Sequence, residues 1–457
     1  MTKRIKLNAV TINGPTVSPG LWAHPDDEAH RFADLQYWID LATTLERGRF
    51  DSLFFADMLG LYDVYQNSPA PALADAIQVP ILDPTYLIPA LADATDHLGF
   101  AVTVSTTYEN PYTLARTFST LDTLTNGRVG WNIVTSNLES AARLHGLGAS
   151  LGPTERYARG DEFLEVAYKL WESSWQDDAV VIDKAGGVYT DPSRVHKIGH
   201  NGPHFSVPGV HSVDPTAQRT PVLFQAGSSE RGRQFAATHA EAVFLNTPTA
   251  AATKFIIDDI RQRAEILGRD PASVLFFPKI TPIVGATTDD AEQRFQDFLT
   301  YSSTEGIFTL LGAWTDIDFA LADPDSLLKI ASRSDTRGLV ESLKRQNSNG
   351  DLSASELAQV FAFGTSALTI GGPREVADYL EEYIDETGAD GFNVASVVQP
   401  ATITEFVDHV VPELQKRGRV QTEYADGTYR ERLTGGGPRL PDDHPGRRHT
   451  FSEGAVL

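Results

Sequence analysis

Residues 221–237, PVLFQAGSSERGRQFAA, join a strand pattern to a helix pattern through a short turn. Pro221 to Gln225 is apolar and rich in β-forming residues, which is typical of a buried strand. A helical pattern begins just beyond the turn and runs to Ala237. Strand, turn and helix in this order predict one β/α unit. The turn itself consists of Ala226, Gly227, Ser228 and Ser229.

The same turn is a candidate phosphate site. Backbone N–H groups at a helix start lack intrahelical partners and lie at the positive end of the helix dipole. Gly227 allows a phosphate to approach the backbone, and the hydroxyls of Ser228 and Ser229 add donors. An ordinary serine N-cap would have the same sequence, and for an isolated serine pair that alternative is favoured. The phosphate interpretation therefore depends on the rest of the chain.

Strand and helix patterns alternate along the chain. Eight β/α units predict a TIM (β/α)8 barrel, with a doubly wound open sheet as the alternative. The predicted strands are 5–12, 52–56, 100–105, 129–134, 222–225, 242–245, 275–284 and 392–397. The predicted helices are 35–45, 86–94, 114–124, 157–171, 233–239, 255–267, 290–299 and 375–386.

Three stretches interrupt this repeat within a predicted barrel domain of residues 1–418. They are 57–84, 180–208 and 305–364, and we expect them to cover the mouth at the C-terminal ends of the strands. The segment 419–457 is rich in Gly, Pro and Arg. We expect it to form an extended tail that dangles or wraps a neighbour rather than adding to the core.

Composition narrows the possible functions. The formal net charge is −23, which argues against nucleic acid or an anionic membrane as a partner. The chain has no cysteine, and no apolar run is long enough for a membrane span, so we expect a cytoplasmic protein. Histidines cluster at His196, His200, His204 and His211, but glycines and a proline between them prevent one helical face, so no metal site is predicted.

Polar residues follow several predicted strands at the same end. Asp57 follows the second strand, Thr106 the third, and Ser136 and Asn137 the fourth, which also contains Asn132. Each could be a helix N-cap, but their coincidence predicts a polar ligand at the barrel mouth.

Five long strings resemble the bacterial-luciferase-like flavin monooxygenases. They point to the branch that holds long-chain alkane, nitrilotriacetate and dibenzothiophene-sulfone monooxygenases. The strings are LERGRFDSLFFADMLG (45–60), AVTVSTTYENPYTLAR (101–116), FSTLDTLTNGRVGWNIVTSN (118–137), ERYARGDEFLEVAYKLW (155–171) and the opening stretch.

This resemblance implies a TIM barrel that binds reduced FMN supplied by a separate NAD(P)H:FMN oxidoreductase. It implies oxygen insertion into a small hydrophobic substrate, and a homodimer or homotetramer. Thr106 and Asn132 match positions that face the reactive edge of the flavin and dioxygen. The implied FMN contacts are Asp57, Thr106, Ser136, Asn137 and Tyr157, with Ala226, Gly227, Ser228 and Ser229 at the phosphate.

Two departures from the alkane enzyme put terminal alkane hydroxylation in doubt. Residues 13–15, Asn-Gly-Pro, stand where that enzyme has a cysteine, and Asn137 stands where it has a histidine. Aromatic and apolar residues near the mouth suggest an apolar or aromatic substrate, or else they pack the barrel. Desulfurisation, N-dealkylation, a deazaflavin-dependent dehydrogenase and flavin storage remain alternatives. The residues near the mouth are Phe55, Leu59, Tyr62 and Trp131.

Overall fold

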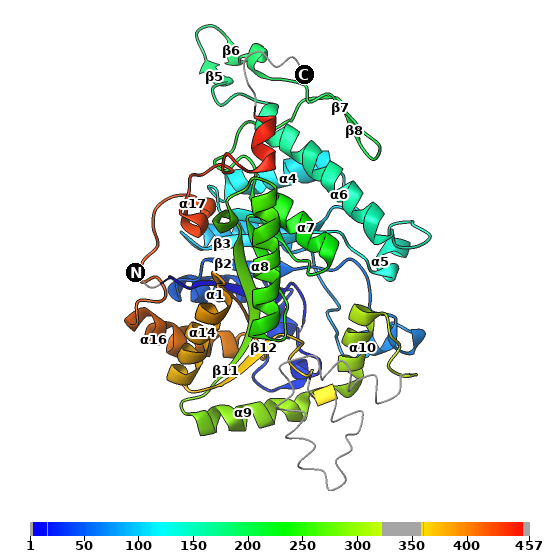
Figure 1. Ribbon diagram of the computed structural model, residues 1–457, viewed down its shortest axis with the longest axis vertical. Helices are drawn as coiled ribbons and strands as arrows, with labels where there is room; N and C mark the ends of the chain where they lie inside the picture. Colours follow the sequence, from blue (N-terminus) through cyan, green and yellow to red (C-terminus); the bar gives the residue numbers. More distant parts are fainter. Residues whose placement is uncertain (1–2, 16, 322–357, 360, 451–457) are drawn as a thin grey trace.

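The computed structural model describes residues 3–15, 17–321, 358–359 and 361–450 (Figure 1). Eight parallel strands pair in the order β10-β9-β4-β3-β2-β1-β13-β11, and β11 pairs back with β10. The ring is therefore a closed TIM barrel, as the sequence predicted, and the open-sheet alternative is wrong. The strands are β1 (Lys6–Ile12), β2 (Ser52–Ala56), β3 (Gly99–Ser105), β4 (Val129–Val134), β9 (Val222–Gln225), β10 (Ala242–Leu245), β11 (Leu275–Val284) and β13 (Gly391–Ala395).

Helices alternate with these strands and begin at recognisable caps. The side chain of Asp34 accepts a hydrogen bond from Gln36 N at the first helix, and Asn110 does the same for Tyr112 N. No helix in the described ranges is both long and apolar enough to cross a membrane. The main helices are α1 (Leu35–Arg47), α3 (Ile88–Asp93), α4 (Pro111–Leu124), α6 (Pro153–Tyr168), α7 (Glu230–His239), α8 (Ala250–Ile266), α9 (Thr288–Tyr301), α14 (Pro373–Thr387), α15 (Ala401–Glu405) and α16 (Val411–Lys416).

Aromatic side chains fill the interior of the barrel. The ring of Phe54 lies 5.6 Å from that of Phe224 and 5.4 Å from that of Phe244. Phe277 joins the same cluster from β11. Because this interior is a packed core, a ligand must bind at an end of the barrel rather than within it.

One strand of the sheet escaped the sequence prediction. β12 (Ala367–Gly371) pairs with the second half of β11, Ile280 to Val284, whereas the first half of β11 pairs with β10. A single long strand thus serves both the barrel and its extension. After β12, Gly372 caps α14 and Pro373 occupies its first position, where proline is well tolerated.

The inserted stretches contain short elements. Residues 180–208 form two antiparallel hairpins that project from one end of the molecule (Figure 1). Residues 57–84 contain α2 (Ala70–Ala74), and the start of 305–364 belongs to α10 (Thr304–Thr315); residues 322–357 and 360 lie outside the described chain. The hairpin strands are β5 (Val180–Asp183), β6 (Val188–Thr190), β7 (His200–Asn201) and β8 (Ser206–Val207).

The tail differs from our expectation because its described part adds to the core. In α17 (Tyr429–Thr434), Tyr429 is 1% exposed and joins the interior cluster together with Leu433. Glycine at the start of β3 makes room, since a Cβ on Gly99 would lie 2.6 Å from the Tyr429 ring. Residues 429–433 therefore close the N-terminal end of the barrel, which we call the floor. The overall Gly, Pro and Arg content concealed these few buried side chains.

Arg430 anchors this floor. Its guanidinium donates to the Glu241 carboxylate at 2.7 and 2.9 Å, and both residues are 1% exposed. Further donors reach the carbonyl oxygens of Thr220, Pro221 and Pro438. A buried charge pair is stabilising only when its remaining donors and acceptors are satisfied, and here they largely are.

Candidate functional site at the barrel mouth

The turn after β9 forms an open cradle beside α6. Ser229 caps α7, accepting a hydrogen bond from Gly232 N at 3.1 Å. The hydroxyl group of Tyr157 in α6 lies close to this turn. A Cβ atom added to Gly232 would lie only 2.9 Å from the Tyr157 hydroxyl oxygen. Ala226, Ser228 and Ser229 are exposed. Helix N–H groups, serine hydroxyls and one phenol thus converge on an accessible surface, which suits a phosphate.

The nearby arginines hold the turn in shape. Arg233 donates to Ser228 O at 2.6 Å and pairs with Asp259 at 2.6 Å. Arg231 pairs with Asp161, and its guanidinium lies 5.0 Å from the centre of the Tyr157 ring. Because both cations already have carboxylate partners, phosphate binding here would rely mainly on the backbone, the hydroxyls and Tyr157.

A cavity of about 300 Å³ lies at the ends of β2, β3 and β4. It brings together two of the predicted ligand contacts, Asp57 and Ser136. The Ser136 hydroxyl donates to the Ser105 hydroxyl at 2.9 Å. The predicted polar strand ends of β2 and β4 therefore do share one space. The other lining residues include Leu59, Asp83, Thr103, Ser105, Glu109 and Phe118.

Asp57 has an altered acidity in this cavity. Burial raises its pKa from 3.8 to about 7, and the neighbouring Asp83 carboxylate contributes in the same direction. A hydrogen bond from Met58 N opposes the shift. Near neutral pH the carboxyl group is thus partly protonated, so it can either donate or accept a hydrogen bond.

Asn132 presents a free acceptor near the same strand ends. Its amide nitrogen donates to the Thr103 hydroxyl at 2.8 Å, which fixes the orientation of the side chain. Its amide oxygen is buried and has no hydrogen-bond partner in the described structure, and the same holds for the Gln225 amide oxygen. Unpartnered buried acceptors are costly, so a polar ligand at this end fits the residues present.

The structure does not bring every predicted site residue to the cavity. Thr106 is fully buried, its hydroxyl donates to Val134 O at 3.3 Å, and it lies against Gly160 of α6. Asn137 is exposed beyond the cavity. Sequence reasoning missed Thr103 and Ser105, although strand alternation places these two on the opposite face from Thr106.

The apolar residues named from the sequence divide between two roles. Phe55 and Trp131 are completely buried in the layer between strands and helices, so they pack the barrel. Tyr62 is buried in a separate cluster with Ile77. Leu59 lines the polar cavity and also a neighbouring, more apolar cavity of about 310 Å³. The mouth therefore combines a polar compartment with an apolar one.

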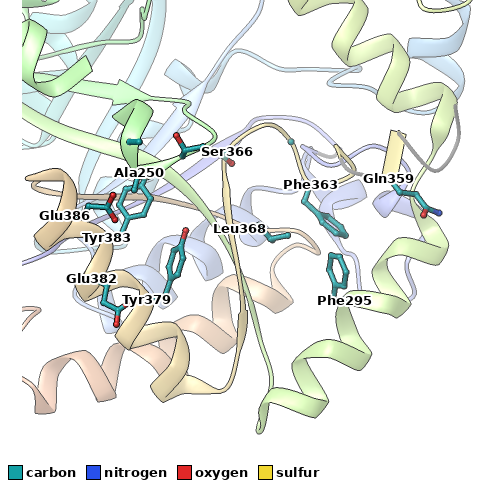
Figure 2. A pocket seen from close by; sticks show the side chains of 13 residues that line it. Ala250, Phe295, Gln359, Phe363, Ser366, Leu368, Tyr379, Glu382, Tyr383 and Glu386 are labelled. Carbon is teal, nitrogen blue, oxygen red and sulfur yellow. The ribbon is translucent and has the colours of Figure 1, made fainter. Parts of the chain in front are cut away.

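A third cavity lies away from these strand ends. It measures about 570 Å³ and lies between α8, α14 and β12 (Figure 2). Phe363 and Phe295 face each other on one side of it, while Tyr379 and Tyr383 come from α14 on the other (Figure 2). None of the predicted flavin contacts lines it.

The clustered histidines have separate partners. His200 contacts the Glu162 carboxylate at 3.1 Å, and His211 contacts the Ser119 hydroxyl at 3.0 Å. Within the described ranges, no group of three or more His, Asp or Glu side chains could hold a metal ion.

Comparison with known proteins adds sequence and structural relatives. A dimethyl-sulfide monooxygenase of Hyphomicrobium sulfonivorans is 46% identical over 98% of this chain and 94% of its own length. A long-chain alkane monooxygenase of Geobacillus thermodenitrificans is 47% identical over 98% of both chains. The structure of a riboflavin lyase with modified FMN and riboflavin is 33% identical, with a TM-score of 0.88 over 98% of this chain and 100% of that one.

Further relatives include nitrilotriacetate and dibenzothiophene-sulfone monooxygenases, so the expected branch is confirmed. The model of the luciferase-like monooxygenase family matches residues 2–420, which spans the whole barrel. Fold, polar strand ends and sequence thus agree: the chain belongs to the luciferase-like monooxygenase family.

Proposed function

We propose that this chain is the oxygenase of a two-component system, which binds reduced FMN from a separate NAD(P)H:FMN oxidoreductase. It would insert one atom of dioxygen into a small, largely apolar substrate. The observation that carries the proposal is the open turn Ala226–Ser229 beside Tyr157, next to a polar cavity at the neighbouring strand ends. The modified FMN in the related riboflavin lyase structure supports it.

Each group of residues has a defined task in this proposal. The amides and hydroxyls of Ser228 and Ser229 would hold the phosphate, with Tyr157 as a further donor. Asp57 would hydrogen-bond the polar ring edge, with its proton present or absent as the bound state requires. Reduced FMN, when bound, would supply the electrons that activate dioxygen. Asn132, held by Thr103, would orient polar atoms at the reacting centre while the apolar walls exclude water.

Two alternatives use the same barrel differently. A desulfurising or N-dealkylating oxygenase would share every residue above and differ only in substrate. A deazaflavin-dependent dehydrogenase would need no oxygen. Labelled dioxygen separates these classes, because a monooxygenase transfers one labelled atom to its product and a dehydrogenase transfers none.

The phosphate turn provides the direct test. The double variant Ser228→Ala, Ser229→Ala should weaken FMN binding at least about tenfold, since it removes donors to a charged group. Ser303→Ala is the matched control, because Ser303 caps the distant helix α10 in the same way, accepting from Gly306 N at 3.0 Å. Unchanged FMN affinity in the double variant, measured by flavin fluorescence quenching, would refute the phosphate site.

A further inference from the structure

Lys279 of β11 is a cation at the barrel mouth that the proposed flavin site does not use. Along β11, Leu275 and Phe277 point into the barrel and belong to its interior cluster. Strand alternation places Lys279 on the same inward face, in register with Asn393 of β13. It lies near the end of the barrel part of β11, and its side chain therefore extends toward the mouth.

The ammonium group of Lys279 ends close to the segment 361–366, which leads into β12. A Cβ on Gly364 would lie 3.4 Å from the Lys279 Nζ, and Gly364 has a left-handed φ of +95°. Gly364 also lines the cavity shown in Figure 2, between the labelled residues Phe363 and Ser366. The lysine thus lies at the boundary between the barrel mouth and that cavity.

Lys279 has no counter-charge in the described structure. Its side chain makes no ion pair and no hydrogen bond there and is partly exposed, and partial burial lowers its pKa from 10.5 to about 8. The deeply buried arginines behave differently, because Arg219, Arg269 and Arg430 each donate several hydrogen bonds. Next to Lys279, the buried amide oxygen of Asn393 also lacks a partner.

The position faces the proposed flavin contacts from across the barrel. In the closed ring, β11 is four strands from β3 in either direction. Asp57, Ser105 and Ser136 lie on the β2–β4 side. The residues that would hold the flavin ring and Lys279 thus stand on opposite sides of the barrel mouth.

We propose that Lys279 binds an acidic group, a carboxylate or a sulfonate, on a substrate whose remaining body is apolar. The Lys279 side chain is only partly buried and has no counter-charge in the described structure, so an anion that enters the mouth can reach the ammonium and pair with it. Phe277 stands two residues before Lys279 on the same face of β11, and its side chain suits an apolar body. This inference deepens the proposed function by naming its substrate class, and it rests on that function for the chemistry.

The test compares matched probes on the full chain by titration calorimetry, with and without FMN. The probes are butane-1-sulfonate, pentanoate and the neutral pentan-1-ol. We expect both anions to bind wild type at least about tenfold more tightly than the alcohol, as for a charged hydrogen bond. Lys279→Met should abolish that preference, and Lys279→Arg should retain it. Lys254→Met is the control, since Lys254 is an exposed residue of α8 paired with Asp258 at 3.1 Å.

The pH dependence gives a second measurement. Sulfonate stays ionised throughout, so its affinity should fall as the pH rises past about 8, the pKa of Lys279. Among the described residues, no titratable side chain of β10, β13 or the segment 361–366 contributes to this pKa shift, which burial causes. Asp57 titrates across the mouth at about 7, and Lys279→Arg separates the two because it removes only the fall above pH 8.

Three outcomes overturn the inference: equal affinity of wild type for anions and alcohol, an unchanged preference in Lys279→Met, or a loss of FMN affinity alone in that variant. The last outcome would indicate that Lys279 binds the flavin rather than the substrate. FMN binding by wild type is read separately from flavin fluorescence. If wild type does not bind FMN, the proposed function is refuted, whereas the measured preference for the sulfonate remains valid.

Discussion

The two ends of the barrel differ in how their charged side chains are paired. At the floor, Arg430 of the tail forms a hydrogen-bonded ion pair with Glu241, and both side chains are buried. At the mouth, Asn132 and Asn393 keep unpartnered oxygens, and Lys279 has no counter-charge in the part of the chain described. The floor therefore contributes stability, whereas the mouth keeps binding capacity for a ligand. Separate substitutions at the two ends can test this division.

The largest effect should come from the floor. Arg430→Met leaves the Glu241 carboxylate buried without its partner, which costs about 3–5 kcal/mol in comparable cases. We expect the free energy of unfolding to fall by that amount in urea titrations. Arg47→Met is the control, because the Arg47–Asp408 pair is largely exposed and should contribute less than about 1 kcal/mol. Similar losses in both variants would contradict the special role of the floor.

A substitution of Asp57 at the mouth should raise the free energy of unfolding, whereas Arg430→Met at the floor lowers it. Its pKa of about 7 in the folded chain exceeds the ordinary 3.8, so the folded state holds the proton more tightly. Its stabilising contribution is therefore complete below pH 3.8 and lost as the pH rises through about 7. Asp57→Asn should thus be more stable than wild type at pH 8, by at most about 4 kcal/mol.

Thermal unfolding of both proteins at pH 5 and pH 8 measures this difference. The advantage of Asp57→Asn should be smaller at pH 5, where wild type still carries most of the proton. An advantage that does not depend on pH would show that packing, rather than the charge of Asp57, limits stability at the mouth.

Tyr157 should affect binding more than stability. Its hydroxyl stands over the turn and has no protein partner in the described structure. Tyr157→Phe should weaken FMN binding about tenfold, the value of one hydrogen bond to a charged group. The unfolding free energy should hardly change. A loss of stability without a loss of FMN affinity would place Tyr157 in the packing instead.

Asn132 should have the smallest effect on binding. Asn132→Ala removes the oriented amide but leaves the phosphate turn intact, so FMN affinity should stay near that of wild type. We expect a larger share of the consumed NAD(P)H to appear as hydrogen peroxide instead of oxygenated product. Assays of peroxide and product in the reductase-coupled reaction measure this share, and an unchanged ratio would count against the role.

The sequence was sufficient for the barrel but not for all of its surroundings. Each β/α unit has a local pattern, so strands such as Val222–Gln225 could be placed from their own residues. β12 has five residues and pairs with half of a longer strand. No local sequence pattern predicts such a pairing. Burial of Tyr429 and Arg430 depends on contacts with segments far away in the chain, which composition does not reveal.

The site was predicted in part for similar reasons. Asp57, Ser136 and the turn at Ser228 follow strands directly, and parallel strands bring their ends together. Thr106 was assigned to the same space, but it lies one position out of phase with Ser105 and so faces α6. Lys279 had a readable signal in LFFPKITPIV, where it shares a face with Leu275 and Phe277, and it was overlooked.

The floor also has a consequence for how the protein is made. Strand β13 completes the ring at Ala395, but Tyr429 and Arg430 leave the ribosome only later. At roughly 5–20 residues per second, the nascent barrel spends seconds with an open hydrophobic end. Chaperones would act in that interval, and a fusion that delays docking of residues 429–433 would prolong it. Yield in the cell should therefore depend on when the floor closes as well as on how stable it is.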